Sequence, residues 1–420
     1  MSLNALSRLT YKMKVFIKDR NFKAIILSIR KLLSIFVRLL FAPIGLIFAI
    51  IIRIIRPWVI VRLDVLQSSR IGHFATNTEL YLCELDNGLN IPDKKYYDIW
   101  YHNWPISNNQ LSKMWSRVLN IWPSIVMQSA DRISRKLPGS YHHIIPPSAS
   151  LDRDLHNLLD DSSPHLSFTY DEEQFGAQEL ERIGVNKGAK FICLNVRDSA
   201  YLDVVMPWQR WDYQDYRDSD VNNYLLACEA LTKRGYYVLR MGAKVNKAFD
   251  TNNPMIIDYA YIGLRTDFMD VYIASKCHFC ISTSTGFDAL ATIFRRPVLY
   301  TDFAHVSYFN SFSRKSMTLF KHHFLESKGR NMKLSEIIDS GAGEIFWTTD
   351  YGYKGIKLIN NSPEELTDAS LEMDDMLSGI IDYSMEDLQD KAKLLFNQLP
   401  MHGDIRARVS KSFLHKDSLL

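Results

Sequence analysis

The chain has 420 residues, which is longer than one ordinary domain and predicts two domains. Its 47% hydrophobic and 23% charged residues can form a sizeable core, and they exclude a disordered or fibrous chain. The formal net charge of +3 hides an asymmetry, because residues 1–56 contain eleven basic residues and one acid, so the remainder carries −7. This distribution excludes a uniformly basic nucleic-acid binder, and no nucleic-acid partner is expected.

Residues 1–56 combine the features of a membrane anchor. Basic and apolar side chains interleave along residues 12–31, which is typical of a helix that lies on anionic lipid. Residues 39–52 are all apolar, Pro or Gly and lie between Arg38 and Arg53. As a helix this run spans only ~21 Å, which is less than the thickness of a bilayer core.

Three alternatives stay open for this segment. They are a marginal spanning helix over residues 32–55, a re-entrant hairpin kinked at Pro43 and Gly45, and a buried core helix. Arginines on both sides of the apolar run favour the membrane over the core. We therefore expect a membrane surface with anionic lipid as a partner, and a peripheral chain that is monotopic or single-pass.

Residues 57–180 alternate between strand and helix patterns, as in an α/β domain. The predicted strands cover residues 58–66, 96–101 and 141–145, and the predicted helices cover residues 78–85 and 109–121. Acidic residues and glycines then become frequent over residues 148–188, which indicates a linker.

Residues 181–345 repeat this alternation more clearly. The predicted strands cover residues 189–196, 236–241, 255–258, 278–282 and 297–300, and the predicted helices cover residues 221–234, 268–275 and 287–294. The pattern predicts an α/β fold with a parallel sheet, whose ligands bind beyond the carboxyl ends of the strands. Helices over residues 363–377 and 385–398, within a tail of residues 346–420, are expected to pack back across the domains.

The scattered cysteines and the absence of several well-known motifs argue against several classes of protein. The five cysteines are scattered, and the pair Cys277 and Cys280 has no second pair to complete a zinc site, so buried thiols are expected. The sequence contains no GxxxxGK[ST], GxGxxG, GxSxG or HExxH motif. Asp218 and Asp220 resemble a metal-binding DxD, but their place before a helix favours capping. No metal or other cofactor is predicted.

The most informative stretch is the turn after the strand at 278–282. It contains Thr283, Ser284, Thr285 and Gly286 and leads directly into a helix. Hydroxyls and free backbone amides at a helix N-terminus favour an anion such as a diphosphate, and glycine allows close approach. The alternative is simple capping by Thr285 with Asp288.

Two arginines follow neighbouring strands at the same edge of the predicted sheet. Arg197 follows the strand at 189–196, and Arg240 ends the strand at 236–241. A guanidinium at either place could bind phosphate oxygens bidentately. The alternative for Arg197 is a salt bridge to Asp198 or Asp203.

A histidine near the start of the first α/β region could act as a base. His73 lies beside Gly72 in a strand-to-helix loop that also contains Arg70. Imidazole titrates near neutrality, which suits abstraction of a proton from an acceptor hydroxyl. Glu79 is the nearest candidate partner carboxylate in the sequence, and a purely structural histidine is the alternative.

Five segments in combination resemble a bacterial family of GT-B glycosyltransferases associated with surface polysaccharide biosynthesis. They are RIGH (70–73), NVRDSAY (195–201), RDSDVNNY (217–224), RGYYVLRMG (234–242) and STSTGFDALA (282–291). The resemblance covers about residues 60–380. NVRDSAY is more distantly similar to the HxRxxD motif of GT-B fucosyltransferases, although Asn195 stands in place of its histidine.

This resemblance implies two Rossmann-like domains that face each other across a cleft. Residues 57–180 would hold the acceptor and residues 181–345 the nucleotide sugar. The implied reaction transfers a sugar to a lipid-linked or oligosaccharide acceptor, without metal, at the cytoplasmic face of the bacterial inner membrane. The alternatives are an inactive membrane-tethered scaffold and a nucleotide-sugar-modifying enzyme such as an epimerase or phosphotransferase.

Overall fold

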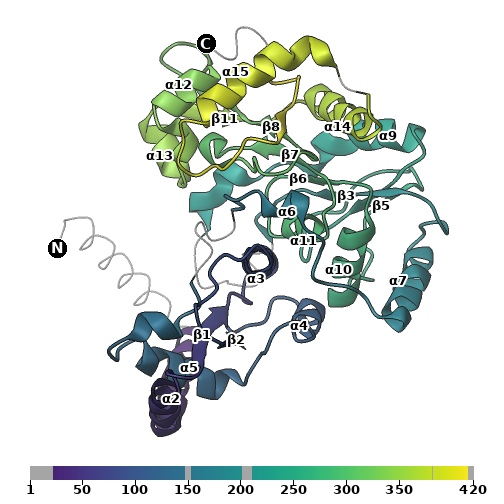
Figure 1. Cartoon of the computed structure of the whole chain (residues 1–420). Helices are drawn as coiled ribbons and strands as arrows, with labels where there is room; N and C mark the ends of the chain where they lie inside the picture. Colours follow the sequence, from purple (N-terminus) through teal and green to yellow (C-terminus); the bar gives the residue numbers. More distant parts are fainter. Residues whose placement is uncertain (1–21, 147–152, 201–210, 381, 415–420) are drawn as a thin grey trace. The chain divides into compact units, whose positions relative to one another are not determined.

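The computed structural model describes residues 22–146, 153–200, 211–380 and 382–414, which form two compact units (Figure 1). Unit 1 comprises the chain up to Val65 with residues 92–102 and 120–145, and unit 2 comprises residues 66–91, 103–119 and 146–420. The expected boundary near residue 180 is therefore not where the contacts divide the chain, because two segments of the first α/β region belong to unit 2.

The centre of unit 2 is a parallel sheet. Within the described residues it has seven strands in the order β12-β8-β7-β6-β3-β4-β5. Their bounds are β3 Phe191–Asn195, β4 Tyr237–Arg240, β5 Ile256–Ile257, β6 Cys280–Ser282, β7 Val298–Phe303, β8 Ser316–Phe320 and β12 Arg408–Val409. Every pairing in this sheet is parallel, which confirms the predicted α/β class.

Helices cover both faces of this sheet, with α9 and α14 on one face and α10 and α11 on the other (Figure 1). Within the described residues, the α-helices of unit 2 are α3 Ile71–Asp86, α4 Asn109–Trp115, α6 Leu158–Asp161, α7 Tyr170–Arg182, α9 Leu225–Lys233, α10 Asp267–Lys276, α11 Asp288–Ile293, α12 Leu334–Asp339, α13 Thr348–Tyr353, α14 Pro363–Leu377 and α15 Glu386–Phe396. Short 3₁₀ helices are η2 Asp212–Arg217, η3 Val221–Tyr224, η4 Val306–Tyr308, η5 Ala342–Glu344 and η6 Tyr383–Met385. Covered strands read as continuous apolar runs, as in the fully buried β3.

The tail belongs to unit 2 as well. Helix α14 packs against α9, and its residue Asp374 accepts hydrogen bonds from Arg234 and Tyr236. The strand β12 adds an edge to the sheet beside β8, and a second, antiparallel sheet contains β9 His322–Leu325, β10 Arg330–Asn331 and β11 Ile356–Ile359. The sequence patterns predicted α14 and α15 but none of these strands.

The predicted linker contains a helix instead. Helix α7 begins with a capping box, in which Thr169 and Glu172 satisfy each other's backbone amides. Of the acidic residues that suggested a linker, Asp160 and Asp161 lie in the short helix α6, and Asp154 accepts the N–H groups of Leu158 and Leu159 at its start. The first turn of α7 is acidic as well, which its dipole favours. Residues 147–152 of the expected linker lie outside the described residues.

Unit 1 has a smaller sheet than the expected Rossmann-like domain. Its strands β1 Ile60–Leu66 and β2 Tyr96–His102 pair, and single bridges add Ile144 and Ile121 at the two sides. The predicted strand at 141–145 is largely a 3₁₀ helix, η1 Ser140–His143. Helix α5, Ser124–Ser134, packs beside this sheet, and the N-terminal helix α2 packs on α5.

Helix α2 runs from Phe22 to Ile54 without a break at Pro43. The re-entrant hairpin was therefore wrong. A Cβ on Gly45 would lie 2.8 Å from the backbone nitrogen of Ala130, so glycine is what lets α2 and α5 approach closely. Within the described residues, none of the helices combines the length and the apolar character that crossing a membrane requires. The basic residues 12–21 lie outside the described part.

All five cysteines are free and buried, as predicted. Burial is the main reason that the pKa of Cys193 and that of Cys280 lie well above the ordinary thiol range. These thiols are therefore inert parts of the core rather than reactive groups.

Candidate functional site

The site lies where the strand order of unit 2 reverses. Strand β3, the first in sequence, pairs with β6, the fourth, and Asn195 at the end of β3 lies opposite Ser282 at the end of β6. The chain leaves these two strands in opposite directions, so a crevice forms beyond their carboxyl ends. Both the segment at 195–198 and the turn at 283–286 therefore meet at this edge.

Hydrogen bonds tie these two segments together. The backbone N–H of Arg197 donates to the Thr283 hydroxyl at 2.8 Å, and the Asn195 amide donates to the Thr285 hydroxyl. Ser284 has a φ of +57°, a left-handed conformation that is uncommon for a residue other than glycine. Such strain is concentrated at functional sites.

The first residue of the helix after this turn holds the turn in place, although the helix has no side-chain hydrogen bond at its N-cap, Phe287. Helix α11 has six residues, and its Asp288 carboxylate accepts hydrogen bonds from the Thr285 N–H and the Ser282 hydroxyl, both at 2.7 Å. The Asp288 half of the predicted capping box is thus present, whereas the Thr285 hydroxyl accepts the N–H of Phe287, which precedes the helix. An anion at this edge would depend on side-chain cations and hydroxyls more than on the α11 amides.

Among the described residues, three cations gather around Asp218, and one of them contacts the turn. Arg197 is mostly buried, and its guanidinium donates to the Gln214 carbonyl at 2.9 Å and pairs with Asp218 at 3.0 Å. Arg217 donates to the Ser284 carbonyl. Lys321, at the end of β8, donates to the Asp218 carbonyl at 2.9 Å and is almost wholly buried.

The electrostatics of this cluster follow from burial and crowding. Burial, together with the Arg217 charge, lowers the pKa of Arg197, and burial also lowers the pKa of Lys321. Burial raises the pKa of Asp218 to about 6, although the Arg197 charge opposes this. At low pH the Asp218 carboxyl is therefore neutral and no longer compensates the neighbouring cations. An anionic ligand can compensate them in its place.

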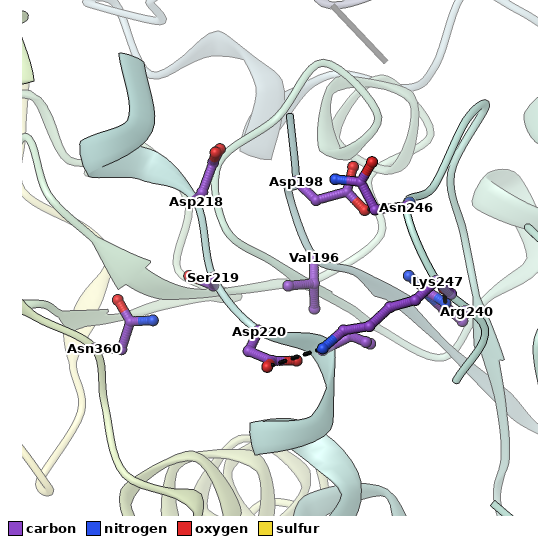
Figure 2. Close-up of a pocket in the computed structure, with 10 residues that line it drawn as sticks. Val196, Asp198, Asp218, Ser219, Asp220, Arg240, Asn246, Lys247 and Asn360 are labelled. Carbon is purple, nitrogen blue, oxygen red and sulfur yellow. Dashed lines mark hydrogen bonds and ion pairs between the residues drawn. The ribbon is translucent and has the colours of Figure 1, made fainter. Parts of the chain in front are cut away.

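A cavity of about 350 Å³ adjoins this cluster beyond the ends of β3 and β4 (Figure 2). Its lining residues are Val196, Asp198, Asp218, Ser219, Asp220, Val221, Arg240, Asn246, Lys247 and Asn360. Figure 2 shows the ion pair between Lys247 and Asp220 at 3.1 Å. Asp220 also accepts the Asn222 N–H as an N-cap, as expected, so Asp218 and Asp220 do not act as a pair.

Arg240 lies in the wall of this cavity but is not aimed at the turn. Its side chain is 2% exposed, and its guanidinium donates to the Lys247 carbonyl at 2.7 Å and to Asp258 at 3.1 Å. These contacts hold the loop after β4. These contacts give Arg240 a positioning role, and its contact with a phosphate stays a prediction.

The first turn of α3 packs directly on the hydroxyl turn. A Cβ on Gly72 would lie 3.1 Å from Gly286 Cα, and a Cβ on Gly286 would lie 2.9 Å from a methyl group of Ile71. This contact explains both glycines. It brings partly exposed His73, the third residue of α3, and exposed Arg70, its N-cap, to the same region of unit 2.

Glu79 lies in a different environment from the one expected. It is fully buried and receives hydrogen bonds from Arg295 at 2.7 Å and from His165 at 3.1 Å. Burial lowers the pKa of His165, but hydrogen bonds with Cys83 and Glu79 outweigh it and raise the pKa to about 10. Although Glu79, Cys83 and His165 could face one metal ion, the Arg295 charge and a protonated His165 already compensate Glu79. Glu79 is thus not brought to His73.

Sequence reasoning missed Arg217, Asp218 and Lys321 as members of the site. The segment RDSDVNNY contained a usable signal, because two charged residues precede a capped helix at the edge of the sheet. The expected partners of Arg197 were different: Asp198 instead accepts backbone N–H groups from Ala200 and Asn246, and Asp203 lies outside the described residues. No local pattern indicated Lys321.

Comparisons with known proteins give distant structural neighbours. The sequence matches no protein-family model and no curated protein. Among solved structures, E. coli ADP-heptose LPS heptosyltransferase II is 13% identical, with a TM-score of 0.35 over 61% of this chain and 90% of that one. A family 9 glycosyl transferase from Veillonella parvula DSM 2008 is 11% identical, with a TM-score of 0.39 over 75% and 97%. E. coli heptosyltransferase WaaC is 12% identical, with a TM-score of 0.29 over 62% and 92%.

Proposed function

We propose that the chain is a GT-B glycosyltransferase whose unit 2 binds the diphosphate of a nucleotide sugar. One observation carries the proposal, and it lies where the strand order reverses. The Arg217 guanidinium contacts the hydroxyl turn 283–286, and the Arg197 backbone N–H holds the same turn while its guanidinium lies at Asp218, the residue after Arg217. Guanidinium groups form charge-assisted, bidentate hydrogen bonds with phosphate oxygens. A crevice of this kind is where open parallel sheets bind their ligands.

The cavity beside Asp198 and Lys247 is where we place the nucleoside or the sugar. It has ionised and amide side chains that match hydroxyl groups, and it opens next to Asp218 in the cation cluster. In the transfer step, an acceptor hydroxyl attacks the anomeric carbon while the bond to the diphosphate breaks. The arginines stabilise the departing diphosphate, so no metal ion is needed for that purpose.

His73 is the proposed base. It lies in the first turn of α3, which packs on the hydroxyl turn through Gly72 and Gly286, and its imidazole would take the proton that the acceptor hydroxyl loses. A His73→Gln variant is expected to keep donor binding and to lose most of its turnover, by about 100-fold or more.

The proposed acceptor is a lipid-linked glycan of a surface polysaccharide, reached at the cytoplasmic face of a bacterial inner membrane. The basic N-terminal region supports this placement, because a chain held on the membrane meets a lipid-linked acceptor at high effective concentration.

A binding screen tests the proposal. Folded full-length protein is titrated with UDP, GDP, ADP, CMP and dTDP, and with the matching nucleosides, and its melting temperature is followed. One nucleoside diphosphate is expected to bind, and its nucleoside much more weakly. Arg197→Met and Arg217→Met should each weaken this binding about ten- to 100-fold.

Arg182→Met is the matched control. Arg182 is an exposed arginine of unit 2, and within the described residues its side chain donates hydrogen bonds to Glu179 alone. Its binding should equal that of the wild type, and the unliganded melting temperature of each variant checks folding. If no nucleotide binds to the folded wild type, the glycosyltransferase proposal fails and the scaffold alternative takes its place.

A further inference from the structure

Helix α2 presents an apolar face with no partner among the described residues. Six large side chains on this face are each 47–64% exposed. They are Phe36, Leu40, Ile44, Ile47, Ile51 and Ile54, and their spacing of three or four residues places them on one side of the helix. Leu46 and Ile50 are also exposed and widen the face. Trp58, just after the helix, is 72% exposed.

The opposite side of the same helix is buried in unit 1. Ala49 and Ile52 are buried against the unit, and Gly45 lies in backbone contact with α5. Asp131 of helix α5 forms an ion pair at 2.8 Å with Arg135, the residue just after the helix. A bilayer that surrounded this part of α2 would also have to surround these charges, which is costly in hydrocarbon.

We propose that α2 lies in the plane of an anionic lipid surface, with its exposed face inserted and α5 facing water. This assigns to residues 36–58 the geometry of an interfacial helix, in which one apolar face enters the headgroup and acyl boundary. Tryptophan prefers that boundary, which suits the exposed Trp58. The proposal concerns unit 1 and stands independently of the nucleotide site in unit 2.

Charge supports lipid as the occupant. Unit 1 contains seventeen basic and five acidic residues, a formal charge of +12, so with a chain total of +3 the remainder carries −9. Anionic headgroups attract such a surface and would repel unit 2. A second copy of α2 fits less well as the occupant. An interface between two helices normally has charged residues along both sides of its apolar stripe, and residues 39–52 contain no charged side chain.

Vesicle flotation tests whether this face binds lipid. Full-length protein is mixed with vesicles of phosphatidylcholine alone or with added phosphatidylglycerol. The wild type should float with the anionic vesicles and be released by high salt. The double variant Ile47→Glu/Ile51→Glu changes only exposed positions and should reduce the bound fraction at least about tenfold.

The matched control is Leu226→Glu/Leu394→Glu, which changes two exposed leucines of unit 2 and should bind like the wild type. Equal binding by Ile47→Glu/Ile51→Glu and the wild type would overturn the proposal. So would a dimer in solution that this variant dissociates while vesicle binding is unchanged. Nucleotide binding in the same samples shows that unit 2 is intact and tests the other proposal separately.

Depth measurements distinguish an in-plane helix from a spanning one. One face of α2 exposes three side chains at intervals of seven residues, Leu40, Ile47 and Ile54. Because all native cysteines are buried, a single cysteine placed at each of these positions can be labelled selectively. Quenching by nitroxide lipids should give one common depth for the three labels. A graded series, up to about 21 Å between the first and last label, would mean a spanning helix and overturn the proposal.

Discussion

The two units differ in charge and in what they bury. Unit 2 is acidic overall, and it buries a parallel sheet whose carboxyl edge concentrates cations at the hydroxyl turn. Unit 1 is strongly basic, and it leaves one apolar helix face exposed beside a sheet of two strands. A positive cluster in an acidic unit favours a small anion locally, whereas positive charge spread over a whole unit favours an extended anionic surface. The difference therefore favours ligand binding and chemistry in unit 2, and attachment to a membrane surface by unit 1.

The largest effect should come from breaking the buried ion pair of unit 1. The Arg62 side chain donates twice to Asp98, at 2.6 and 2.5 Å, and both residues are buried. Asp98→Ala leaves a buried guanidinium without its carboxylate, so it should lower the free energy of unfolding by about 3–5 kcal/mol. Denaturation in urea measures the loss, and hydrogen exchange localises it.

The loss should be confined to the amides of unit 1, with nucleotide binding in unit 2 retained. Asp93→Ala is the control, because Asp93 is exposed in the same unit and should change stability by less than about 0.5 kcal/mol. An equal loss of protection in unit 2 would show that the two units unfold together, which would contradict their separation.

A smaller effect is expected from the glycine contact within unit 2. Gly286→Ala adds a methyl group 2.9 Å from the Ile71 side chain and 3.1 Å from the Gly72 nitrogen. Crowding of this kind costs about 1–3 kcal/mol, and it should displace the hydroxyl turn and weaken nucleotide binding more than it lowers stability. Calorimetric titration and thermal unfolding of the same sample give both quantities.

Gly352→Ala is the control for this change. No atom lies within 4 Å of a Cβ at Gly352, which is inside helix α13, so alanine should be neutral or stabilising by up to about 1 kcal/mol. Unchanged nucleotide affinity in Gly286→Ala would separate the α3 contact from the binding site.

Local patterns predicted five of the seven described strands in the sheet of unit 2, without β8 and β12, and they predicted the hydroxyl turn. The apolar runs of β3 and β6, and the four small residues after β6, are consecutive in sequence, so burial and turn chemistry could be inferred directly. The capping box of α7 is a local pattern too, because Thr169 and Glu172 are three residues apart, but the acidic composition of residues 148–188 favours a linker.

Other features depend on contacts between distant segments. Lys321 reaches Asp218 across 103 residues of sequence, and Gly72 meets Gly286 across more than 200. The division into units depends on residues 66–91 and 103–119, which belong to unit 2 although the segments before and between them belong to unit 1. No change in composition marks where these two segments begin or end. Arg240 was placed at the correct strand end, but the pairing that occupies its guanidinium involves Asp258, on another loop.

The smallest expected effect is a pH dependence set by Asp218 in unit 2. Burial raises its pKa to about 6 in the folded state, above its ordinary value of 3.8. The folded protein therefore binds this proton more tightly than the unfolded chain. The resulting stabilisation is complete below about pH 4 and is lost as the pH rises through 6.

The same proton should govern the cation cluster. Above pH 6 the ionised Asp218 pairs with Arg197 and competes with phosphate, whereas below pH 6 the neutral acid leaves Arg197 to the ligand. Asp218→Asn should therefore bind nucleoside diphosphate a few-fold more tightly than the wild type at pH 7.5 and equally at pH 5. Both proteins are titrated across this pH range. Because the nucleotide ionises in the same way in both titrations, its ionisation does not change the ratio of the two affinities. A constant ratio of the two affinities would mean that Asp218 does not titrate beside the bound phosphate.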